Sequence, residues 1–248
     1  MDRKNQAIFV GATDTGVGKT LISGLLVAYL RGRGIKAGYQ KWVATGCAAD
    51  EPEDLLTVAQ LLEAMNSARP VGPEAEAVPA WRAELELAVP YRFRLPASPH
   101  LAAAEEGREI DPALLKARFA EALAAHEVLV VEGVGGLLVP LTRQLLLLDL
   151  VAELELPTLL VARSGLGTIN HTLLSLEALR RREIPLLGVV CSDEEPEPPK
   201  LIASDNLATI AALGRTRVFG RLPRCRQSIA AHAAFAPIGA GIAAALAT

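Results

Sequence analysis

A glycine-rich segment near the N-terminus has the residue types and spacing of a phosphate-binding loop. In IFVGATDTGVGKT, an apolar run leads into a turn with Gly16 and Gly18, and Lys19 opens a segment with helical periodicity. The glycines let the backbone approach a ligand, and its N–H groups and the helix N-terminus can hold anionic oxygens. Lys19 can reach the β- and γ-phosphates of a nucleotide, and the Thr20 hydroxyl can bind Mg²⁺. A chance Gly-Lys-Thr would not explain the preceding strand and the paired glycines, so we predict a nucleoside triphosphate site.

A lysine and a carboxylate lie at the ends of two further apolar runs. Lys41 ends GYQK, and Glu132 ends LVVE just before GVGG. In open α/β sheets ligands bind outside the carboxyl ends of the strands. A carboxylate at that edge suits magnesium, which prefers oxygen ligands. The alternatives are an exposed surface charge for Lys41 and a surface acid or helix N-cap for Glu132.

The segment SGLGTINH places Gly165 and Gly167 directly before a helical pattern, which makes a second candidate anion site. The alternative is a simple glycine turn in which Thr168 or Asn170 caps the helix. One residue can serve both purposes, so the sequence leaves both interpretations open.

Short apolar runs alternate with helical periodicity along the chain, which predicts a mostly parallel sheet with helices on both faces. We expect one α/β domain, a P-loop fold, over residues 1–248. The predicted strands are Ala7–Val10, Gly38–Val43, Val128–Val131, Thr158–Val161, Leu186–Cys191 and Arg217–Gly220. The predicted helices include Lys19–Arg31, Asp111–Ala125 and Asn170–Arg181, with Asp111-Pro112 as a start signal.

Two segments are predicted to be loops: Arg69–Pro99, which is rich in proline and contains Trp81, and Asp193–Lys200, DEEPEPPK. The apolar C-terminal stretch Ile229–Thr248 is interrupted by proline and glycines. A membrane span needs about 20 strongly apolar residues, so we expect a helix or a docked tail there and no membrane association.

Composition narrows the function classes. The formal net charge of -3 gives no basic surface for nucleic acid. Three scattered cysteines, Cys47, Cys191 and Cys225, predict neither a disulfide framework nor a zinc site. The N-terminal residues show no signal-peptide core, and we expect a cytoplasmic protein.

The motifs resemble those of the dethiobiotin synthetases. TDTGVGKT is similar to that family's phosphate loop, whereas related partitioning ATPases carry a second lysine at the position of Asp14. Four further blocks resemble the family in the same order: GYQKWVATG, SPHLAAAEEGREI, LVVEGVGGLLVPL and SGLGTINHTLLSLEAL. The resemblance covers most of residues 7–222.

The resemblance implies an ATP- and Mg²⁺-dependent ligase that forms the ureido ring of dethiobiotin from 7,8-diaminononanoate and CO₂ through a carbamate and a carbamic-phosphoric anhydride. It implies a homodimer in which a substrate carboxylate binds across the interface. The implied catalytic residues are Lys19, Lys41 and Thr15, with Thr15 and Thr45 orienting the carbamate. The implied ATP-binding residues are Thr13, Asp14, Thr15, Gly16, Val17, Gly18, Lys19, Thr20, Ser192, Leu222 and Pro223. The implied substrate-binding residues are Thr45, Gly165, Leu166, Gly167, Thr168 and Asn170.

For magnesium the resemblance implies Thr20, Glu132 and an aspartate after the Lys41 loop. Asp50, Glu51, Glu53 and Asp54 compete for that role, and an acidic run is usually a solvated face. We choose Asp54, because it heads the helical pattern LLTVAQLLEA as the family's aspartate does.

Four positions depart from the family pattern. Ala12 stands where the family usually has glycine, with Gly11 one residue earlier, Gly16 stands where some members have glutamate, and Trp42 replaces the proline after the lysine. Ser192 replaces an asparagine that contacts adenine, and its single hydroxyl oxygen cannot make the bidentate contact of an amide, whose oxygen and nitrogen accept and donate side by side. We therefore expect weaker discrimination for adenine.

Two other functions are considered. An amidotransferase-type cobyrinate synthase domain would need a glutaminase unit with a nucleophilic cysteine, and no cysteine lies in such a motif. A nucleotide-switch or partitioning protein would hydrolyse ATP without a diamine or bicarbonate. Asp14, Lys41 and the SGLGT segment argue against it.

Overall fold

The computed structural model describes residues 5–47, 52–67, 85–193 and 199–247. Its elements follow the order β1 (Gln6–Ala12), α1 (Lys19–Gly32), β2 (Ala37–Lys41), β3 (Val43–Thr45), α2 (Glu53–Ser67), α4 (Leu85–Ala88), β4 (Tyr91–Phe93), α5 (Pro99–Glu105), α6 (Pro112–Ala125), β5 (Val128–Glu132), α7 (Leu147–Glu153), β6 (Thr158–Arg163), α8 (Thr168–Arg181), β7 (Leu186–Ser192), α9 (Lys200–Gly214), β8 (Val218–Leu222) and α10 (Ser228–Leu246).

The main sheet has six strands in the order β2-β5-β1-β6-β7-β8, and all neighbouring strands pair in parallel. The predicted α/β class and parallel sheet are therefore confirmed. Because the strands are parallel, their carboxyl ends meet at one edge of the sheet, where ligands bind in this architecture. The loops after β1, β2, β5, β6, β7 and β8 all leave from that edge.

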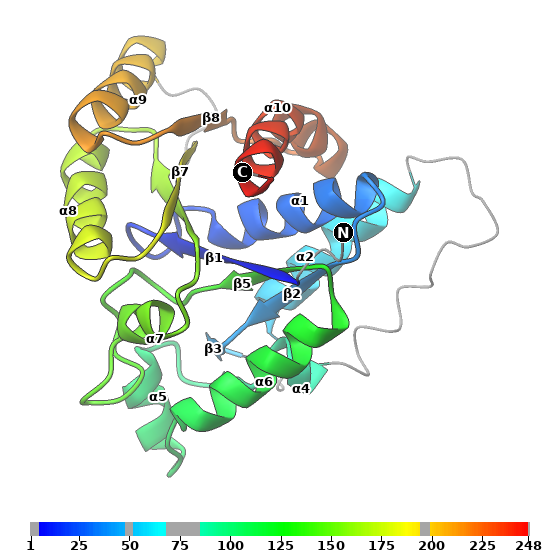
Figure 1. The fold of residues 1–248 in the computed structure, drawn as a ribbon, viewed down its shortest axis with the longest axis vertical. Helices are drawn as coiled ribbons and strands as arrows, with labels where there is room; N and C mark the ends of the chain where they lie inside the picture. The colour runs from blue at the N-terminus through cyan, green and yellow to red at the C-terminus, as the bar shows by residue number, and fades with distance from the viewer. Residues whose placement is uncertain (1–4, 48–51, 68–84, 194–198, 248) are drawn as a thin grey trace.

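Helices cover both faces of the sheet (Figure 1), and side chains alternate between two cores. On one face, Ile8 and Val10 of β1 pack with residues of α1, α2 and α10. On the other face, Phe9 packs with residues of α6, α7 and α8. This alternation follows from the period of two in a strand, and burial on both faces explains the continuous apolar runs in the sequence.

The predicted strand Gly38–Val43 is wrong in one respect, because the chain breaks at Trp42 into β2 and β3. β2 pairs with β5 in the main sheet, whereas β3 pairs in parallel with β4 in a separate two-stranded sheet. Trp42 is 1% exposed and its ring lies 5.9 Å from that of Phe9 and 6.3 Å from that of Phe119. Burying this large side chain in the core turns the chain out of the main sheet directly after Lys41.

The predicted loop Arg69–Pro99 is also partly wrong. Residues 68–84, including Trp81, lie outside the described residues, but the stretch 85–99 contains α4, β4 and the first residue of α5, joined by short loops. In Asp193–Lys200 the predicted loop ends where α9 begins at Lys200, and residues 194–198 lie outside the described residues. Prolines pointed to a loop, whereas Tyr91 and Phe93 form β4 because they stack at 6.0 Å inside the core.

The helix starts were predicted with mixed success. Asp111 caps α6 as expected, since its side chain accepts a hydrogen bond from the Ala113 N–H at 2.8 Å. For α8 neither Thr168 nor Asn170 is the N-cap. Gly167 takes that position in a left-handed conformation with φ 88°, without a side-chain capping bond. The helix therefore begins at Thr168, two residues before the predicted start.

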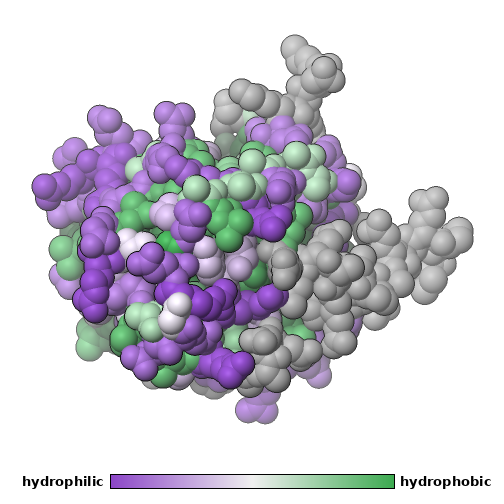
Figure 2. All heavy atoms as spheres, turned by 90° about the horizontal axis from the view of Figure 1, so that it is seen from below, coloured by the Kyte–Doolittle hydropathy of each residue, from purple (hydrophilic) through white to green (hydrophobic). Residues whose placement is uncertain are grey.

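The apolar C-terminal stretch forms α10, which by length and composition is one helix that could cross a membrane. Its buried residues, among them Phe235 and Ile238, pack in the core with α1, and the helix also contacts α2, β7 and β8. On the face shown in Figure 2, hydrophilic and hydrophobic residues are interspersed. Cys47, Cys191 and Cys225 are all free.

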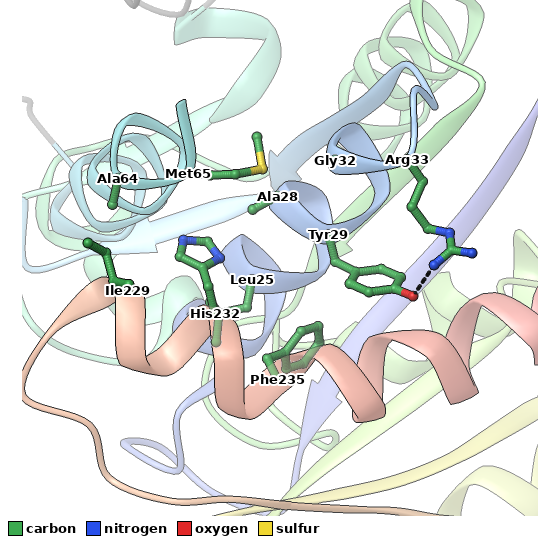
Figure 3. A pocket seen from close by; sticks show the side chains of 10 residues that line it. All are labelled: Leu25, Ala28, Tyr29, Gly32, Arg33, Ala64, Met65, Ile229, His232 and Phe235. Carbon is green, nitrogen blue, oxygen red and sulfur yellow. Dashed lines mark hydrogen bonds between the residues drawn. The ribbon is translucent and has the colours of Figure 1, made fainter. Parts of the chain in front are cut away.

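A cavity of about 310 Å³ lies between α1, α2 and α10, with Tyr29, Met65 and His232 among its lining side chains (Figure 3). Its α1 residues run from Leu25 to Gly32 and so lie about 9–20 Å along the helix from Lys19. It contains none of the predicted site residues.

Candidate functional site

The phosphate loop connects β1 to α1 and has the backbone that its glycines allow. Gly16 has φ 76° and Gly18 has φ 95°, the left-handed region that other residues rarely adopt. Lys19 folds back along the loop, and its Nζ donates to the Asp14 carbonyl at 3.3 Å and to the Gly135 carbonyl at 2.7 Å. The ammonium group is thus held above the loop, as a phosphate-binding lysine requires.

The segment GVGG after β5 lies against this loop. A Cβ placed on Gly135 would lie 3.5 Å from the Thr15 Oγ1, and one on Gly136 would lie 3.6 Å from the Thr13 carbonyl. Gly135 also has φ 59°. The β5 loop therefore runs close beside the phosphate loop, and its Gly135 carbonyl accepts a hydrogen bond from Lys19.

Beside Lys19, four side chains from four different elements form one polar cluster. The Lys41 Nζ lies 2.8 Å from the Glu132 Oε1 and 2.9 Å from the Asp54 Oδ2. The Thr20 hydroxyl bridges the same two carboxylates, at 2.6 Å from the Asp54 Oδ1 and 2.8 Å from the Glu132 Oε1. We call Thr20, Lys41, Asp54 and Glu132 the carboxylate cluster.

The sheet register explains why these residues meet. Lys41 and Glu132 are direct neighbours on β2 and β5, and each is the last residue of its strand. Thr20 lies in the first turn of α1, and Asp54 lies in the first turn of α2. α1 and α2 pack against each other, so their first turns lie side by side at the edge of the sheet.

Within the cluster, Lys41 and the carboxylates stabilise each other's charged forms. Burial alone would lower the pKa of Lys41, but Glu132 and Asp54 outweigh it and raise that pKa above 10.5. Burial would raise the pKa of Asp54, but Lys41 and the Thr20 hydrogen bond lower it below 3.8. At neutral pH Lys41 is therefore a cation and Asp54 an anion.

Lys19 differs from Lys41 in its electrostatics. Burial, opposed by the charge of Glu132 and reinforced by that of Lys41, lowers the pKa of Lys19 to about 8. A bound phosphate would add negative charge beside this ammonium group and favour its protonated form. Lys19 is thus a group whose charge a phosphate ligand stabilises.

The cluster suits magnesium. Among the described residues no group of three or more His, Cys, Asp or Glu side chains is placed to hold a metal ion. Magnesium in phosphate sites, however, is bound through one or two carboxylates together with phosphates and water. The two carboxylates and the Thr20 hydroxyl, next to the phosphate loop, provide that donor set.

Of the two described candidates, Asp54 is the acid that joins the cluster, and its role as a magnesium ligand stays a prediction. The Asp54 carboxylate accepts from the Thr20 hydroxyl and pairs with the Lys41 ammonium, whereas Glu53 is exposed. Asp50 and Glu51 lie outside the described residues.

Tyr39 and Gln40 are part of the site's support and were not predicted. The Tyr39 hydroxyl donates to the Glu132 Oε2 at 2.9 Å, and burial together with the Glu132 charge raises the pKa of Tyr39 well above 10.0. Gln40 accepts from the Trp42 indole N–H and donates to the carbonyls of Leu87 and Arg118. Alternation along the strand could have identified Tyr39, which shares a strand face with Lys41.

The remaining predicted residues lie at the same edge of the sheet. β6 neighbours β1, and the Arg163 guanidinium lies 3.4 Å from the Thr15 carbonyl and 3.5 Å from the Asp14 carboxylate. The segment Gly165–Asn170 that follows therefore begins beside the phosphate loop. Its Leu166 side chain is 93% exposed.

On the next two strands, Ser192 and Leu222 are register partners at the ends of β7 and β8, and Pro223 follows. A Cβ on Gly18 would lie 2.8 Å from the Ser192 Oγ, so this serine contacts the phosphate loop itself. Val17 of the loop and Leu222 are buried in the same hydrophobic core. Thr45 ends β3 in the smaller sheet, half-buried, with Phe93 as its register partner.

Comparisons with known proteins identify the family of the chain. A family model described as an AAA domain matches residues 6–232. The ATP-dependent dethiobiotin synthetase BioD of Anaeromyxobacter dehalogenans (strain 2CP-C) is 42% identical over 219 residues, 88% of this chain and 90% of that protein. The protein of the same name from Rhodopseudomonas palustris (strain BisB5) is 44% identical over 235 residues, 92% of both chains.

Solved structures share the fold at much lower identity. A ParA family ATPase from Chlorobium tepidum TLS superimposes with a TM-score of 0.54 at 12% identity, over 99% of both chains. The cell division ATPase MinD of Pyrococcus furiosus gives a TM-score of 0.55 at 14% identity, over 97% of this chain and 99% of that one. At such identity the likeness concerns the fold alone, whereas the identity to the synthetases extends over nearly the whole sequence. The chain therefore belongs to the ATP-dependent dethiobiotin synthetases.

Proposed function

We propose that this chain forms the ureido ring of dethiobiotin from 7,8-diaminononanoate, CO₂ and ATP, and releases ADP and phosphate. The observation that carries the proposal is the position of Lys41, held between Asp54 and Glu132 beside the Thr20 hydroxyl of the phosphate loop. A cation, two carboxylates and a phosphate loop within one cluster suit a reaction between two anions.

The chemistry brings together groups that repel each other. One substrate amine captures CO₂ as a carbamate, whose oxygen attacks the γ-phosphorus of ATP while the bond to ADP breaks. The product is a carbamic-phosphoric anhydride. The neighbouring amine then attacks its carbonyl carbon, phosphate leaves and the ring closes. Phosphoryl transfer depends mainly on positioning and on charge stabilisation.

The residues of the site divide this work. Lys19 binds the β- and γ-phosphates, and Lys41 lies where the carbamate would meet the γ-phosphate. Thr15, at the exposed tip of the phosphate loop, and Thr45 are assigned to orient the carbamate. Thr20, Asp54 and Glu132 would hold Mg²⁺, which when bound neutralises negative charge on the phosphates.

The nucleotide is assigned to the loops at the same edge. Residues 13–20 surround the phosphates, and Ser192, Leu222 and Pro223 border the base and ribose. The contact between Ser192 and Gly18 supports a nucleotide that runs from the phosphate loop toward the ends of β7 and β8. A serine there provides one hydroxyl, and for this reason we assign weak discrimination among bases.

The substrate carboxylate is assigned to Gly165, Leu166, Gly167, Thr168 and Asn170 of a second protomer. Because the segment would act across an interface, we assign a homodimer, with the 93%-exposed Leu166 of this segment facing the partner. Three free cysteines are consistent with a reducing compartment, and we assign the enzyme to the cytoplasm.

Calorimetric titration tests the proposal. 7,8-Diaminononanoate is titrated into the protein with bicarbonate, Mg²⁺ and a nonhydrolysable ATP analogue, for the wild type and for Lys41→Ala. Binding that requires the nucleotide and is weakened by the substitution supports the assignment. Absence of binding to the wild type under every nucleotide would refute it and would favour a nucleotide switch.

A further inference from the structure

A buried asparagine outside the predicted site holds the segment after β6. Asn206 lies on α9, 42 residues from Ser164 in sequence, and is 6% exposed. Its side-chain amide donates to the carbonyl of Ser164 at 2.8 Å and to that of Gly165 at 3.0 Å. One buried amide group therefore fixes two successive peptide groups.

Fixing these carbonyls also fixes the N–H groups that follow them. In a trans peptide the C=O of one residue and the N–H of the next point in opposite directions. Because the carbonyls of Ser164 and Gly165 point at Asn206, the N–H groups of Gly165 and Leu166 point away from it. The Thr168 hydroxyl holds the preceding carbonyl, that of Arg163, at 2.7 Å.

The same segment is tied to β7. The Ser164 hydroxyl donates to the Asp193 carboxylate at 2.5 Å, and the Ser164 N–H donates to the Ser192 carbonyl at 3.2 Å. The Asp193 N–H in turn donates to the Leu222 carbonyl at 3.0 Å, and its carboxylate lies 3.6 Å from the Arg221 Nε. The segment is thus anchored on two sides by buried polar groups.

We propose that Asn206 is a positioning residue, which orients the backbone N–H groups of Gly165 and Leu166 so that they bind the carboxylate of the substrate. The inference rests on the proposed function, in which this segment receives that carboxylate. Asn206 touches no substrate. It acts through the two peptide groups that it holds.

The test compares two diamines that differ only in the carboxylate. One is the diamino acid substrate, for which KM is measured, and the other is the same chain without its carboxylate, 2,3-diaminooctane, for which the inhibition constant is measured. Both constants are determined for the wild type and for Asn206→Ala. We expect the substitution to raise the KM for the acid about tenfold, as when a hydrogen bond to a charged group is weakened. The inhibition constant of the diamine without a carboxylate and the KM for ATP should stay within about twofold, because neither molecule is assigned to the N–H groups of Gly165 and Leu166.

A matched control separates positioning from loss of stability. Ile210→Val removes one buried methyl group from the same helix, about one turn further on. It should lower the melting temperature without changing the KM for the acid. If Asn206→Ala is too unstable to assay, Asn206→Ser takes its place, because it keeps a hydrogen-bond donor on a shorter side chain. It should raise the KM for the acid selectively, but by a smaller factor.

The outcomes are distinct. A selective rise in the KM for the acid supports the inference. An unchanged KM for the acid, or an equal rise for both diamines or for ATP, would overturn it while leaving the proposed function intact. If the wild type does not convert 7,8-diaminononanoate at all, the proposed function falls and this inference falls with it.

Discussion

Replacement of Lys41 by methionine should destabilise the protein in a manner that depends on magnesium. Lys41 and Glu132 form a buried pair, with side chains 7% and 0% exposed, while the Asp54 side chain is 32% exposed. Removing one partner of a buried ion pair costs about 3–5 kcal/mol, because the remaining charge stays buried. The hydroxyls of Thr20 and Tyr39 still bond Glu132, so we expect the lower end, about 3 kcal/mol.

The assay is thermal unfolding in EDTA and again in Mg²⁺. In EDTA the variant should melt about 6–12 °C below the wild type, the shift that corresponds to 3 kcal/mol in a chain of this size. Mg²⁺ should stabilise the variant more than the wild type, because the Lys41 ammonium no longer competes for the carboxylates of Asp54 and Glu132. The kcat should fall about 100- to 1000-fold even in saturating Mg²⁺, as when a preorganised charge donor is removed.

A surface lysine provides the matched control. Lys116 pairs with Glu153 at 2.6 Å, but both side chains are largely exposed, at 38% and 53%. Lys116→Met should therefore change stability by less than about 1 kcal/mol, with or without Mg²⁺. If Lys41→Met in EDTA behaves like this control, or if Mg²⁺ stabilises wild type and variant equally, the reasoning about the carboxylate cluster is refuted.

Three further predictions follow from the same structure. Thr20→Val keeps the shape of the side chain but removes the hydroxyl between Asp54 and Glu132, so the Mg²⁺ concentration for half-maximal activity should rise about tenfold. Thr20→Ser should return that concentration to the wild-type value. No change in Thr20→Val would argue against Thr20 as a ligand. In a panel of nucleoside triphosphates, ATP should be preferred by less than about 100-fold in kcat/KM, because Ser192 lacks an amide that donates and accepts together; strict dependence on ATP would contradict this. Burial raises the pKa of Cys191 to about 12 from 9.0, so its thiol should resist Ellman's reagent at pH 8 until the protein unfolds. As the pH rises, the thiol loses its proton in the unfolded state before it does in the folded state. The contribution of Cys191 to the free energy of unfolding is therefore complete below pH 9 and declines by about 1.4 kcal/mol per pH unit up to 12. The free energy of unfolding of Cys191→Ala should decline less steeply above pH 9 than that of the wild type, and equal slopes would refute the buried thiol.

The parts of the fold that the sequence predicted are those that depend on local pattern. Four strands, β1, β5, β6 and β7, are continuous apolar runs because helices cover both faces of the sheet. Such a run can be recognised in the sequence without knowing which residues touch it. Asp111 caps α6 for a similarly local reason. Lys41 and Glu132 could be expected to lie together because a parallel sheet brings the ends of its strands to one edge.

The misses depend on contacts between distant segments. The break at Trp42 arises because its ring packs on Phe9 and Phe119, residues far away in the chain. β4 was hidden because its short run lies among prolines and pairs only with β3. Asn206 could not be recognised at all, because its role comes from two carbonyls on another element.

The most direct test of the account is a balance of carbon and phosphate. The protein is incubated with ATP, Mg²⁺, 7,8-diaminononanoate and radiolabelled bicarbonate, and both labelled dethiobiotin and released phosphate are measured. The account predicts one labelled product for each phosphate released, and no phosphate release when either the diamine or bicarbonate is omitted. Steady phosphate release without the diamine, and without labelled product, would contradict it.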